Sequence, residues 1–245
     1  MPDLLVHDLG LRGFAETLDI QRAAARARIR GALDQDLLLL VEHSPVVTLG
    51  RSSKEGHLIA TPAHLAARGV ELFAEVERGG NVTFHGPGQL VGYPIVDLKR
   101  HRQDLHWYLR QVEETLIRGL AALGIAAERR EKLTGVWTDG RKIASIGVHA
   151  RDWVTWHGFA LNVSTDLRYF DLIVPCGIGG VEMTSVEREL GRDVPMGDAR
   201  TAMTTAFAEV FDLRAAPMSQ DSFEALLAAP EGAARVSPLV ALGME

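Results

Sequence analysis

GVWTDGRKIASIGVHA, residues 135–150, carries the clearest fold signal in this 245-residue chain. Two apolar runs flank Asp139-Gly140, a dipeptide typical of tight β-hairpin turns. A short connection at Arg151-Asp152 leads into a further strand pattern over residues 153–163, so the region predicts a meander of antiparallel strands. Local antiparallel pairing indicates an α+β protein rather than a parallel, doubly wound sheet.

Other apolar runs extend the predicted sheet upstream of the hairpin. They lie at residues 4–10, 36–42, 46–49, 70–76, 90–98 and 125–129. We expect the strands at 36–42 and 46–49 to be neighbours. Because Pro94 cannot donate a ladder hydrogen bond, the strand that contains it is expected at a sheet edge or at a bulge.

The helices are predicted from apolar spacing and from capping residues. The clearest one follows the N-cap candidate Asp104 and ends at Gly124, with apolar residues recurring every three or four positions. Further helices are expected at residues 14–30, at 62–67 after Thr61, at 186–190 after a capping-box pattern, after the N-cap candidate Asp198, and after Pro217. We expect a mixed, largely antiparallel sheet flanked by helices.

Composition and charge exclude several classes of protein. The net charge of -6 and the pI near 5.9 argue against a nucleic-acid binder, which normally carries a basic face. No run of eighteen apolar residues predicts a membrane span, and the N-terminus lacks the pattern of a secretory signal. We therefore expect a cytoplasmic protein that binds neither nucleic acid nor membrane.

A glycine-rich loop, RGGNVTFHGPGQ at residues 78–89, interrupts the strand pattern. Glycine is used where backbone needs positive φ or where another group approaches too closely for a Cβ. The loop is therefore either a binding element or an ordinary glycine-rich hairpin, and its own sequence leaves the two readings open.

Cys176 is the single cysteine and lies in VPCGIGG, residues 174–180. Lone cysteines in cytosolic proteins are mostly buried and inert. The flanking glycines, however, would let an acyl group approach the sulfur and would leave N–H groups free to stabilise an oxyanion. This context favours a nucleophile for acyl transfer.

A cysteine nucleophile needs a base or a cation, because the thiolate is the attacking form. The candidates are Lys142 and the histidines His85, His149 and His157. In a strand, Lys142 shares a face with apolar side chains, so it is expected to point toward the core, where it could exchange protons with a thiol. The alternative is a lysine that extends to solvent at the hairpin end. The histidines lack metal-ligand spacing, so no metal is expected.

Several motifs, in this order along the chain, resemble the lipoyl(octanoyl) transferase family. They are RGGNVTFHGPGQ at 78–89, GVW at 135–137, KIASIGV at 142–148, WHGFALN at 156–162 and PCGI at 175–178. The resemblance implies a catalytic domain like those of biotin and lipoate protein ligases over residues 1–216. Residues 217–245 would form a C-terminal tail, partly helical or loosely ordered.

The resemblance also implies a reaction and its residues. An octanoyl group would pass from acyl carrier protein to a lysine of lipoyl domains, in 2-oxoacid dehydrogenase E2 subunits or the glycine cleavage H protein. No cofactor is implied beyond the carrier's phosphopantetheine. Cys176 would carry the acyl thioester and Lys142 would move protons. Substrate contacts are implied for Arg78, Gly79, Gly80, Asn81, Val82, Thr83, Phe84, His85, Ser145, Ile146, Gly147, Gly158, Phe159 and Ala160.

Three positions depart from the common family pattern: Asn81 replaces Gln, Phe84 replaces Tyr, and Ser44 replaces a second proline. The missing Tyr hydroxyl puts any hydrogen bond from position 84 in doubt. Arg51 and Arg78 are expected to be exposed and to help dock acidic carrier proteins. The rival readings are an ATP-dependent lipoate or biotin ligase, which needs no cysteine nucleophile, and a non-catalytic protein that binds acyl carriers.

Overall fold

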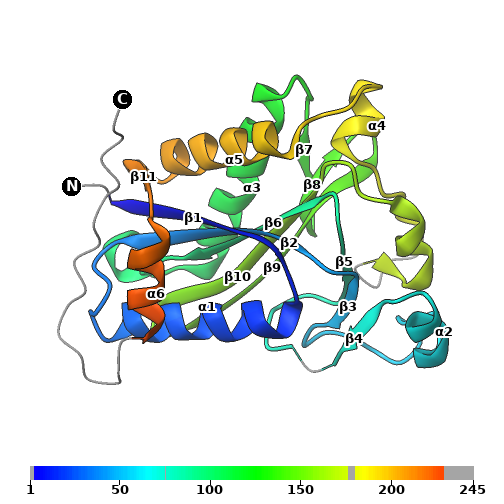
Figure 1. Cartoon of the computed structure of the whole chain (residues 1–245). Coiled ribbons are helices and arrows are strands. Elements are labelled where there is room, and N and C mark those ends of the chain that lie inside the picture. Colours follow the sequence, from blue (N-terminus) through cyan, green and yellow to red (C-terminus); the bar gives the residue numbers. More distant parts are fainter. Residues whose placement is uncertain (1–2, 75, 176–179, 229–245) are drawn as a thin grey trace.

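An eight-stranded sheet in the order β11-β1-β2-β6-β10-β9-β8-β7 forms the centre of the molecule (Figure 1). The computed structural model describes residues 3–74, 76–175 and 180–228. The strands are β1 (Leu4–Arg12), β2 (Asp36–His43), β6 (Gln89–Ile95), β7 (Glu128–Arg130), β8 (Leu133–Thr138), β9 (Arg141–Arg151), β10 (Val154–Asn162) and β11 (Ala215–Pro217). Strands β11, β1 and β2 run parallel, and every other neighbouring pair is antiparallel. The predicted α+β class and the β8-β9-β10 meander are confirmed.

Helices cover both faces of this sheet. On one face lie α1 (Phe14–Ile29) and α6 (Gln220–Ala228), and on the other α3 (Leu105–Ala122) and α5 (Met196–Val210) (Figure 1). Strand β2 shows why the arrangement forms. Leu37 and Leu39 belong to the core under α1, whereas Leu38 and Leu40 belong to the core under α3. Its unbroken apolar run therefore reflects burial on both faces.

A second, three-stranded sheet stands beside the first. It consists of β4 (Glu71–Phe73), β3 (Val46–Leu49) and β5 (Val82–His85) in that order, next to α2 (Pro62–Ala67). The expected pairing of β3 with β2 is wrong, because β3 pairs with β4 and β5 instead. This sheet has a separate apolar core that includes Val47, Leu65 and Phe170. The 3-10 helices η1 (Leu98–Arg100) and η2 (Leu167–Leu172) and the short α4 (Val186–Leu190) complete the described elements.

The helix ends follow the local sequence closely. The Asp104 carboxylate accepts hydrogen bonds from the backbone N–H groups of His106 and Trp107 at 2.9 and 3.0 Å, as predicted for an N-cap. Helix α5 begins at Met196, and its N-cap is Pro195 instead of the expected Asp198. Asp198 therefore lies in the first turn, where its negative charge still favours the positive helix end.

Pro94 lies in an interior strand, so the expectation of an edge is wrong. Strand β6 sits between β2 and β10, and Pro94 is opposite Leu38 of β2. The ladder from β6 to β10 ends at Gly92, two residues before the proline. Across from it, the β10 backbone departs from regular strand geometry, since His157 has a φ of 56°. An irregularity in β10 thus accommodates the proline.

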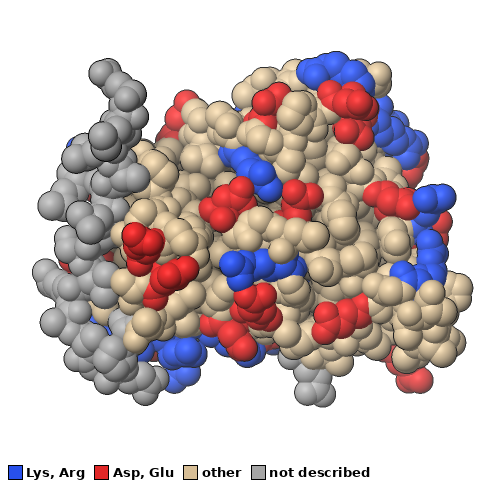
Figure 2. Space-filling model, in the orientation of Figure 1, with Lys and Arg blue, Asp and Glu red and all other residues tan. Residues whose placement is uncertain are grey.

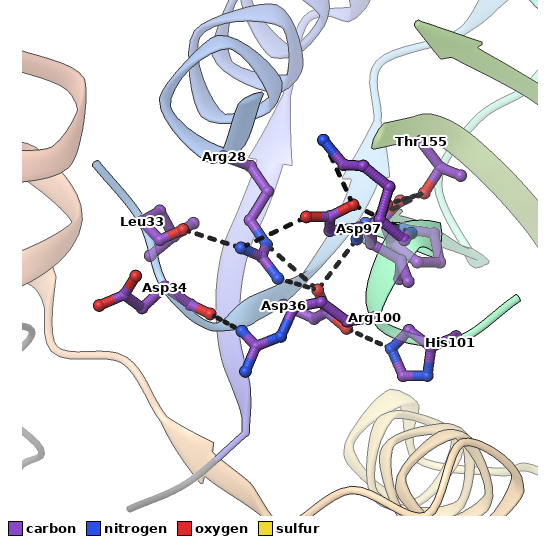
Figure 3. A network of polar contacts seen from close by, with 11 residues as sticks. Arg28, Leu33, Asp34, Asp36, Asp97, Arg100, His101 and Thr155 are labelled. Carbon is purple, nitrogen blue, oxygen red and sulfur yellow. Dashed lines mark hydrogen bonds and ion pairs between the residues drawn. The ribbon is translucent and has the colours of Figure 1, made fainter. Parts of the chain in front are cut away.

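A buried ionic network joins α1, β2 and η1 at one end of the sheet (Figure 3). The Arg28 guanidinium donates to Asp36 Oδ1 at 3.1 and 3.2 Å, and the backbone N–H of Asp97 donates to the same oxygen at 3.0 Å. His101 Nε2 lies 2.7 Å from the second Asp36 oxygen. The side chains of Arg28 and Asp36 are only 5% and 4% exposed. Asp36 therefore connects three separate segments away from solvent.

The chain beyond Pro217 contributes to the core. Strand β11 extends the sheet beside β1, and the helix expected after Pro217 is α6. Phe223 of α6 is buried and stacks on the His7 ring at 4.0 Å. The predicted domain boundary at 216 falls within β11 and stays a prediction, and residues 229–245 lie outside the described part. Among the described residues, no helix is long and apolar enough to cross a membrane.

Candidate functional site

A cavity of about 230 Å³ lies between the main sheet and the glycine-rich loop. Strands β8, β9 and β10 form one wall, and the loop with β5 forms the other. Phe14 and Tyr93, which are 1% and 3% exposed, line its inner end. Lys132 and Thr134 line the opposite end and are exposed. The cavity therefore runs from a solvent-facing end into the core.

Most of the predicted substrate-contacting residues come together here. The lining includes Lys142 together with Arg78, Gly80, Asn81, Val82, Thr83, His85, Ser145, Ile146, Gly147, Gly158, Phe159 and Ala160. Residues from three distant parts of the sequence thus share one cavity. Gly79 is not among the lining residues, and its N–H donates to the carbonyl of Val148 at 2.8 Å.

Phe84 points away from the cavity. Its ring stacks on Tyr169 at 4.6 Å, meets Phe170 edge-on, and belongs to the core of the small sheet. Alternation along β5 sends Thr83 and His85 to the cavity and Phe84 to the opposite side. Phe84 is therefore not among the residues that line the cavity.

The glycines bring protein backbones together. A Cβ on Gly147 would lie 2.8 Å from the carbonyl oxygen of Gly79, and one on Gly158 would lie 2.2 Å from that of Gly92. Real Cβ atoms do not approach backbone oxygens so closely, so larger residues would force the strands and the loop apart. The glycine-rich loop was expected to leave room for a ligand. In the structure the closest approaches are made by Gly147 of β9 against the loop and by Gly158 of β10 against β6, so strand glycines allow these walls to meet.

Lys142 is buried inside the cavity wall. The residue is 2% exposed, which agrees with the predicted core-facing orientation and contradicts a lysine extended to solvent. Its ammonium group donates to the carbonyl of Thr134 at 3.1 Å and lies 5.0 Å from the Trp137 ring centre. Its own backbone bonds to Glu182 and Thr184 on the segment after residue 180. A cation is therefore held at a fixed place beside an apolar cavity.

Gly135 and Glu113 hold this lysine in position, and the sequence reasoning assigned neither of them such a role. Gly135 has a φ of 130°, and a Cβ there would lie 2.7 Å from Lys142 Cε. Glu113 of α3 is 1% exposed and accepts a hydrogen bond from the Gly135 N–H at 3.3 Å. Arg110 and Arg129 neutralise it at 2.6 and 3.2 Å. The sequence does contain a signal for Glu113. A glutamate that lies between Val112 and Leu116 on the apolar face of a helix is a charged residue where burial is expected.

Gly135→Ala is expected to lower the free energy of unfolding by about 2–3 kcal/mol, since it combines backbone strain with a clash against Lys142. Urea denaturation measures the change. Gly31→Ala is the matched control, because Gly31 has a φ of 72° but open space around its Cβ position. It should cost about 1 kcal/mol. Equal costs for the two variants would contradict the role of Gly135 in making room for the lysine.

Neutral histidines surround the inner end of the cavity. His43 Nε2 lies 2.7 Å from the Tyr93 hydroxyl, and His85 Nδ1 lies 2.7 Å from Gln89 Oε1. Burial lowers the pKa of His43 to about 4 and that of His157 to about 3. Burial also holds the pKa of His85 well below its usual value. These rings are therefore uncharged at neutral pH.

Two further expectations concern Cys176 and Arg78. Cys176 lies outside the described residues, so its role stays a prediction. Val181, five positions later in the sequence, lines the cavity with Lys142. The other expectation, an exposed Arg78, is wrong. Arg78 is 6% exposed, and its guanidinium donates to the carbonyl and hydroxyl of Thr48, both at 2.8 Å. Arg78 therefore ties the glycine-rich loop to β3. The other arginine, Arg51, is exposed as expected.

Figure 2 shows acidic and basic side chains interspersed over one face. Within residues 3–74, 76–175 and 180–228, no three His, Cys, Asp or Glu side chains are placed to hold a metal ion. His149, one of the candidate bases, contacts Arg51 and packs edge-on against Trp156 outside the cavity.

The structure thus combines a mixed sheet, helices on both of its faces, and a cavity with largely apolar walls that contains a buried lysine. A family model, the lipoyl protein ligase A/B catalytic domain, matches residues 14–208, and the chain belongs to this family.

Curated relatives agree with this membership. The chain is 47% identical to an octanoyltransferase of Myxococcus xanthus over 86% of its own length and 60% of that protein. It is 49% identical to an octanoyltransferase of Koribacter versatilis, over 84% and 83%. The chain therefore spans less than two thirds of the first relative and most of the second.

Solved structures share the fold. A putative lipoate protein ligase from Thermoplasma acidophilum aligns with a TM-score of 0.69 at 18% identity, over 92% of both chains. A lipoate-protein ligase A bound with ATP aligns with a TM-score of 0.67 at 18% identity, also over 92% of both. The expected biotin/lipoate ligase-like fold is confirmed.

Proposed function

We propose that this protein moves an octanoyl group from octanoyl-acyl carrier protein to a specific lysine of lipoyl domains, through a thioester on Cys176. The observation that carries the proposal is the buried Lys142 ammonium at one end of an apolar-walled cavity. The curated relatives named octanoyltransferase support the choice of acyl group.

The reaction proceeds in two exchanges. The Cys176 thiolate attacks the octanoyl carbonyl, the bond to the phosphopantetheine sulfur breaks, and the carrier thiol leaves with a proton. The acceptor lysine amine then attacks the new thioester, so an amide forms and the Cys176 thiolate is released. Lys142 takes or gives the proton in each exchange. One thioester replaces another at nearly equal energy and amide formation is downhill, so no ATP, metal or further cofactor takes part.

The cavity supplies binding energy for the acyl chain. Burying about seven methylene groups at roughly 0.8 kcal/mol each would provide several kcal/mol. This energy would fix the carbonyl beside Lys142 and Cys176. The acceptors in this proposal are lipoyl domains of 2-oxoacid dehydrogenase E2 subunits and the glycine cleavage H protein, in the cytoplasm. The exposed Arg51 would assist docking of these acidic partners.

Incubation of the purified protein with octanoyl-acyl carrier protein tests the proposal. Intact-mass spectrometry should show one octanoyl adduct, and peptide mapping should place it on Cys176. Cys176→Ser should form no thioester and should lose transfer to a lipoyl domain. Full transfer activity in Cys176→Ser would exclude the mechanism.

The structural likeness to a lipoate-protein ligase bound with ATP makes an ATP-dependent ligase the second candidate. Such an enzyme activates a free acid as an adenylate. The two candidates separate when free octanoate with ATP and octanoyl-acyl carrier protein without ATP are supplied in parallel to the same lipoyl domain. Transfer only from octanoate and ATP would favour the ligase.

A further inference from the structure

Lys142 lies at a point where β10 no longer pairs with β9. The ladder between these two strands ends at Ala144, two residues from Lys142. A short strip, residues 182–184, takes the place of β10 beside the lysine. The Lys142 N–H donates to the carbonyl of Glu182 at 2.8 Å, and the Thr184 N–H donates to the carbonyl of Lys142 at 2.9 Å. The 182–184 strip therefore fixes one side of the backbone that carries the lysine.

Asn162, the last residue of β10, holds the 182–184 strip in place. Its Nδ2 donates to the carbonyl of Thr184 at 2.9 Å. Its Oδ1 accepts a hydrogen bond from Gln89 Nε2, also at 2.9 Å, so both ends of the amide are used. Asn162, Gln89 and Thr184 are all buried. Loss of the Asn162 amide would therefore leave two polar groups unpaired away from solvent.

The other side of the strip is tied to the residue next to Lys142. The Thr184 hydroxyl donates to the Glu189 carboxylate, and the Arg141 guanidinium donates to the same carboxylate at 2.9 and 3.0 Å. Val181, which directly precedes the strip, lines the cavity. The 182–184 strip is thus held from both sides where it borders the cavity.

The hydrogen bonds of Asn162 have a direction that a backbone group determines. A carbonyl can only accept, so the Thr184 carbonyl requires the NH2 group of Asn162. The Asn162 oxygen then faces the NH2 group of Gln89, and the Gln89 oxygen lies 2.7 Å from His85 Nδ1. His85 must therefore carry its proton on Nδ1. Because burial holds the pKa of His85 well below its usual value, Nε2 is unprotonated in a ring that lines the cavity.

We propose that Asn162 is a positioning residue for the acyl transfer, and that it acts by holding the 182–184 strip against the backbone of Lys142. This inference rests on the proposed function. Without the Asn162 amide the strip can shift, and a displacement of about 1 Å at reacting groups can slow an enzyme by about a hundredfold. Asn162 is not among the residues that line the cavity, so binding of the acyl chain should change little.

Asn162→Leu tests the proposal, because leucine keeps much of the volume and removes both hydrogen bonds. The kcat for octanoyl transfer should fall by about tenfold or more, whereas KM for octanoyl-acyl carrier protein should change by less than about threefold. Asn162→Ala, which adds no branched side chain, should give the same result. A normal kcat in both variants would overturn the proposal.

Val154→Ala is the matched control on the same strand. Val154 is fully buried in the core under α1 and does not line the cavity. Its truncation should lower the midpoint of urea unfolding, as the changes at Asn162 do, and should keep kcat within about twofold of the unmodified protein. An equal loss of kcat in Val154→Ala and Asn162→Leu would show a merely structural role for Asn162.

Nitrogen NMR of the histidine rings tests the hydrogen-bond direction in the unmodified protein. Protonated and unprotonated ring nitrogens give separate signals, and His85→Gln identifies the signals of His85 by their loss. At neutral pH, His85 should be protonated at Nδ1 and unprotonated at Nε2. The opposite tautomer would contradict the order of hydrogen bonds from Thr184 to His85, and with it the placement of the Asn162 amide.

The two proposals fail separately in this design. Absence of octanoyl transfer by the unmodified protein would refute the proposed function, and the NMR measurement does not depend on that activity. Octanoyl transfer that stays normal in Asn162→Leu and Asn162→Ala would refute only the positioning role.

Discussion

Lys142→Met is expected to slow octanoyl transfer by a factor of about 10²–10⁴, the usual contribution of a positioned general acid or base. Methionine keeps the length of the side chain and removes the charge that lies 3.1 Å from the Thr134 carbonyl. Because a buried charge is replaced by an apolar group of similar shape, the free energy of unfolding should not fall as the activity does. Single-turnover transfer and urea denaturation measure the two effects on one preparation.

Two further lysine variants separate charge from proton exchange. Lys142→Arg keeps a positive charge that does not ionise near neutral pH, so it should favour the Cys176 thiolate and still fail to move protons. Lys54→Ala is the control, since Lys54 is exposed and lies outside the cavity. It should retain normal transfer. Unchanged transfer in Lys142→Met would leave the proposed proton shuttle without support.

Asp36→Ala is expected to reduce the free energy of unfolding by about 3–5 kcal/mol, because it leaves the buried Arg28 guanidinium without its closest carboxylate partner. The backbone N–H of Asp97 loses its acceptor in the same step. Since α1, β2 and η1 meet at this carboxylate (Figure 3), the loss should appear as lower global stability. Chemical denaturation followed by far-UV circular dichroism measures it.

Asp19→Ala on the same helix is the control for this prediction. Asp19 is 81% exposed and lies 3.7 Å from Arg22, so its removal should cost less than about 1 kcal/mol. The double variant Arg28→Ala/Asp36→Ala should lose less than the sum of the two single variants, because the network is already broken by either one. Additive losses would show that Arg28 and Asp36 act independently.

Much of the fold could be predicted because its signals are local. Asp139-Gly140 sets a hairpin through positive φ at both positions, and the structure has φ values of 44° and 83° there. Asp104 begins α3 through bonds to N–H groups two and three residues away. Alternation along β9 turned Lys142 toward the core, since side chains in a strand alternate between faces. The order of the motifs along the chain is specific enough to indicate the family, and the matching family model confirms it.

Features that depend on contacts between residues far apart in the sequence could not be predicted. Strand β3 follows β2 closely in the chain, yet it pairs with β4 and β5, because Val47 and its neighbours bury their side chains in a separate core. Arg78 looked exposed as a charged residue in a loop, and it is buried because the Thr48 carbonyl and hydroxyl accept its hydrogen bonds. Neither outcome can be read from a residue and its immediate neighbours.

The chain's own order of residues therefore establishes the α+β class, the main hairpin and helix, and the family, and it pointed to many of the residues that line the cavity. Periodicity and turn chemistry depend on residues that are close together in the chain, so these features can be predicted from the sequence alone. The folded molecule alone establishes that Gly135 and Glu113 hold Lys142 and that Phe84 packs in the core of the small sheet. It also establishes that the ring nitrogens of the buried His157 have no hydrogen-bond partner within residues 3–74, 76–175 and 180–228. Those properties arise from contacts between segments tens of residues apart, and only close packing of the sheet, helices and loop brings those segments together.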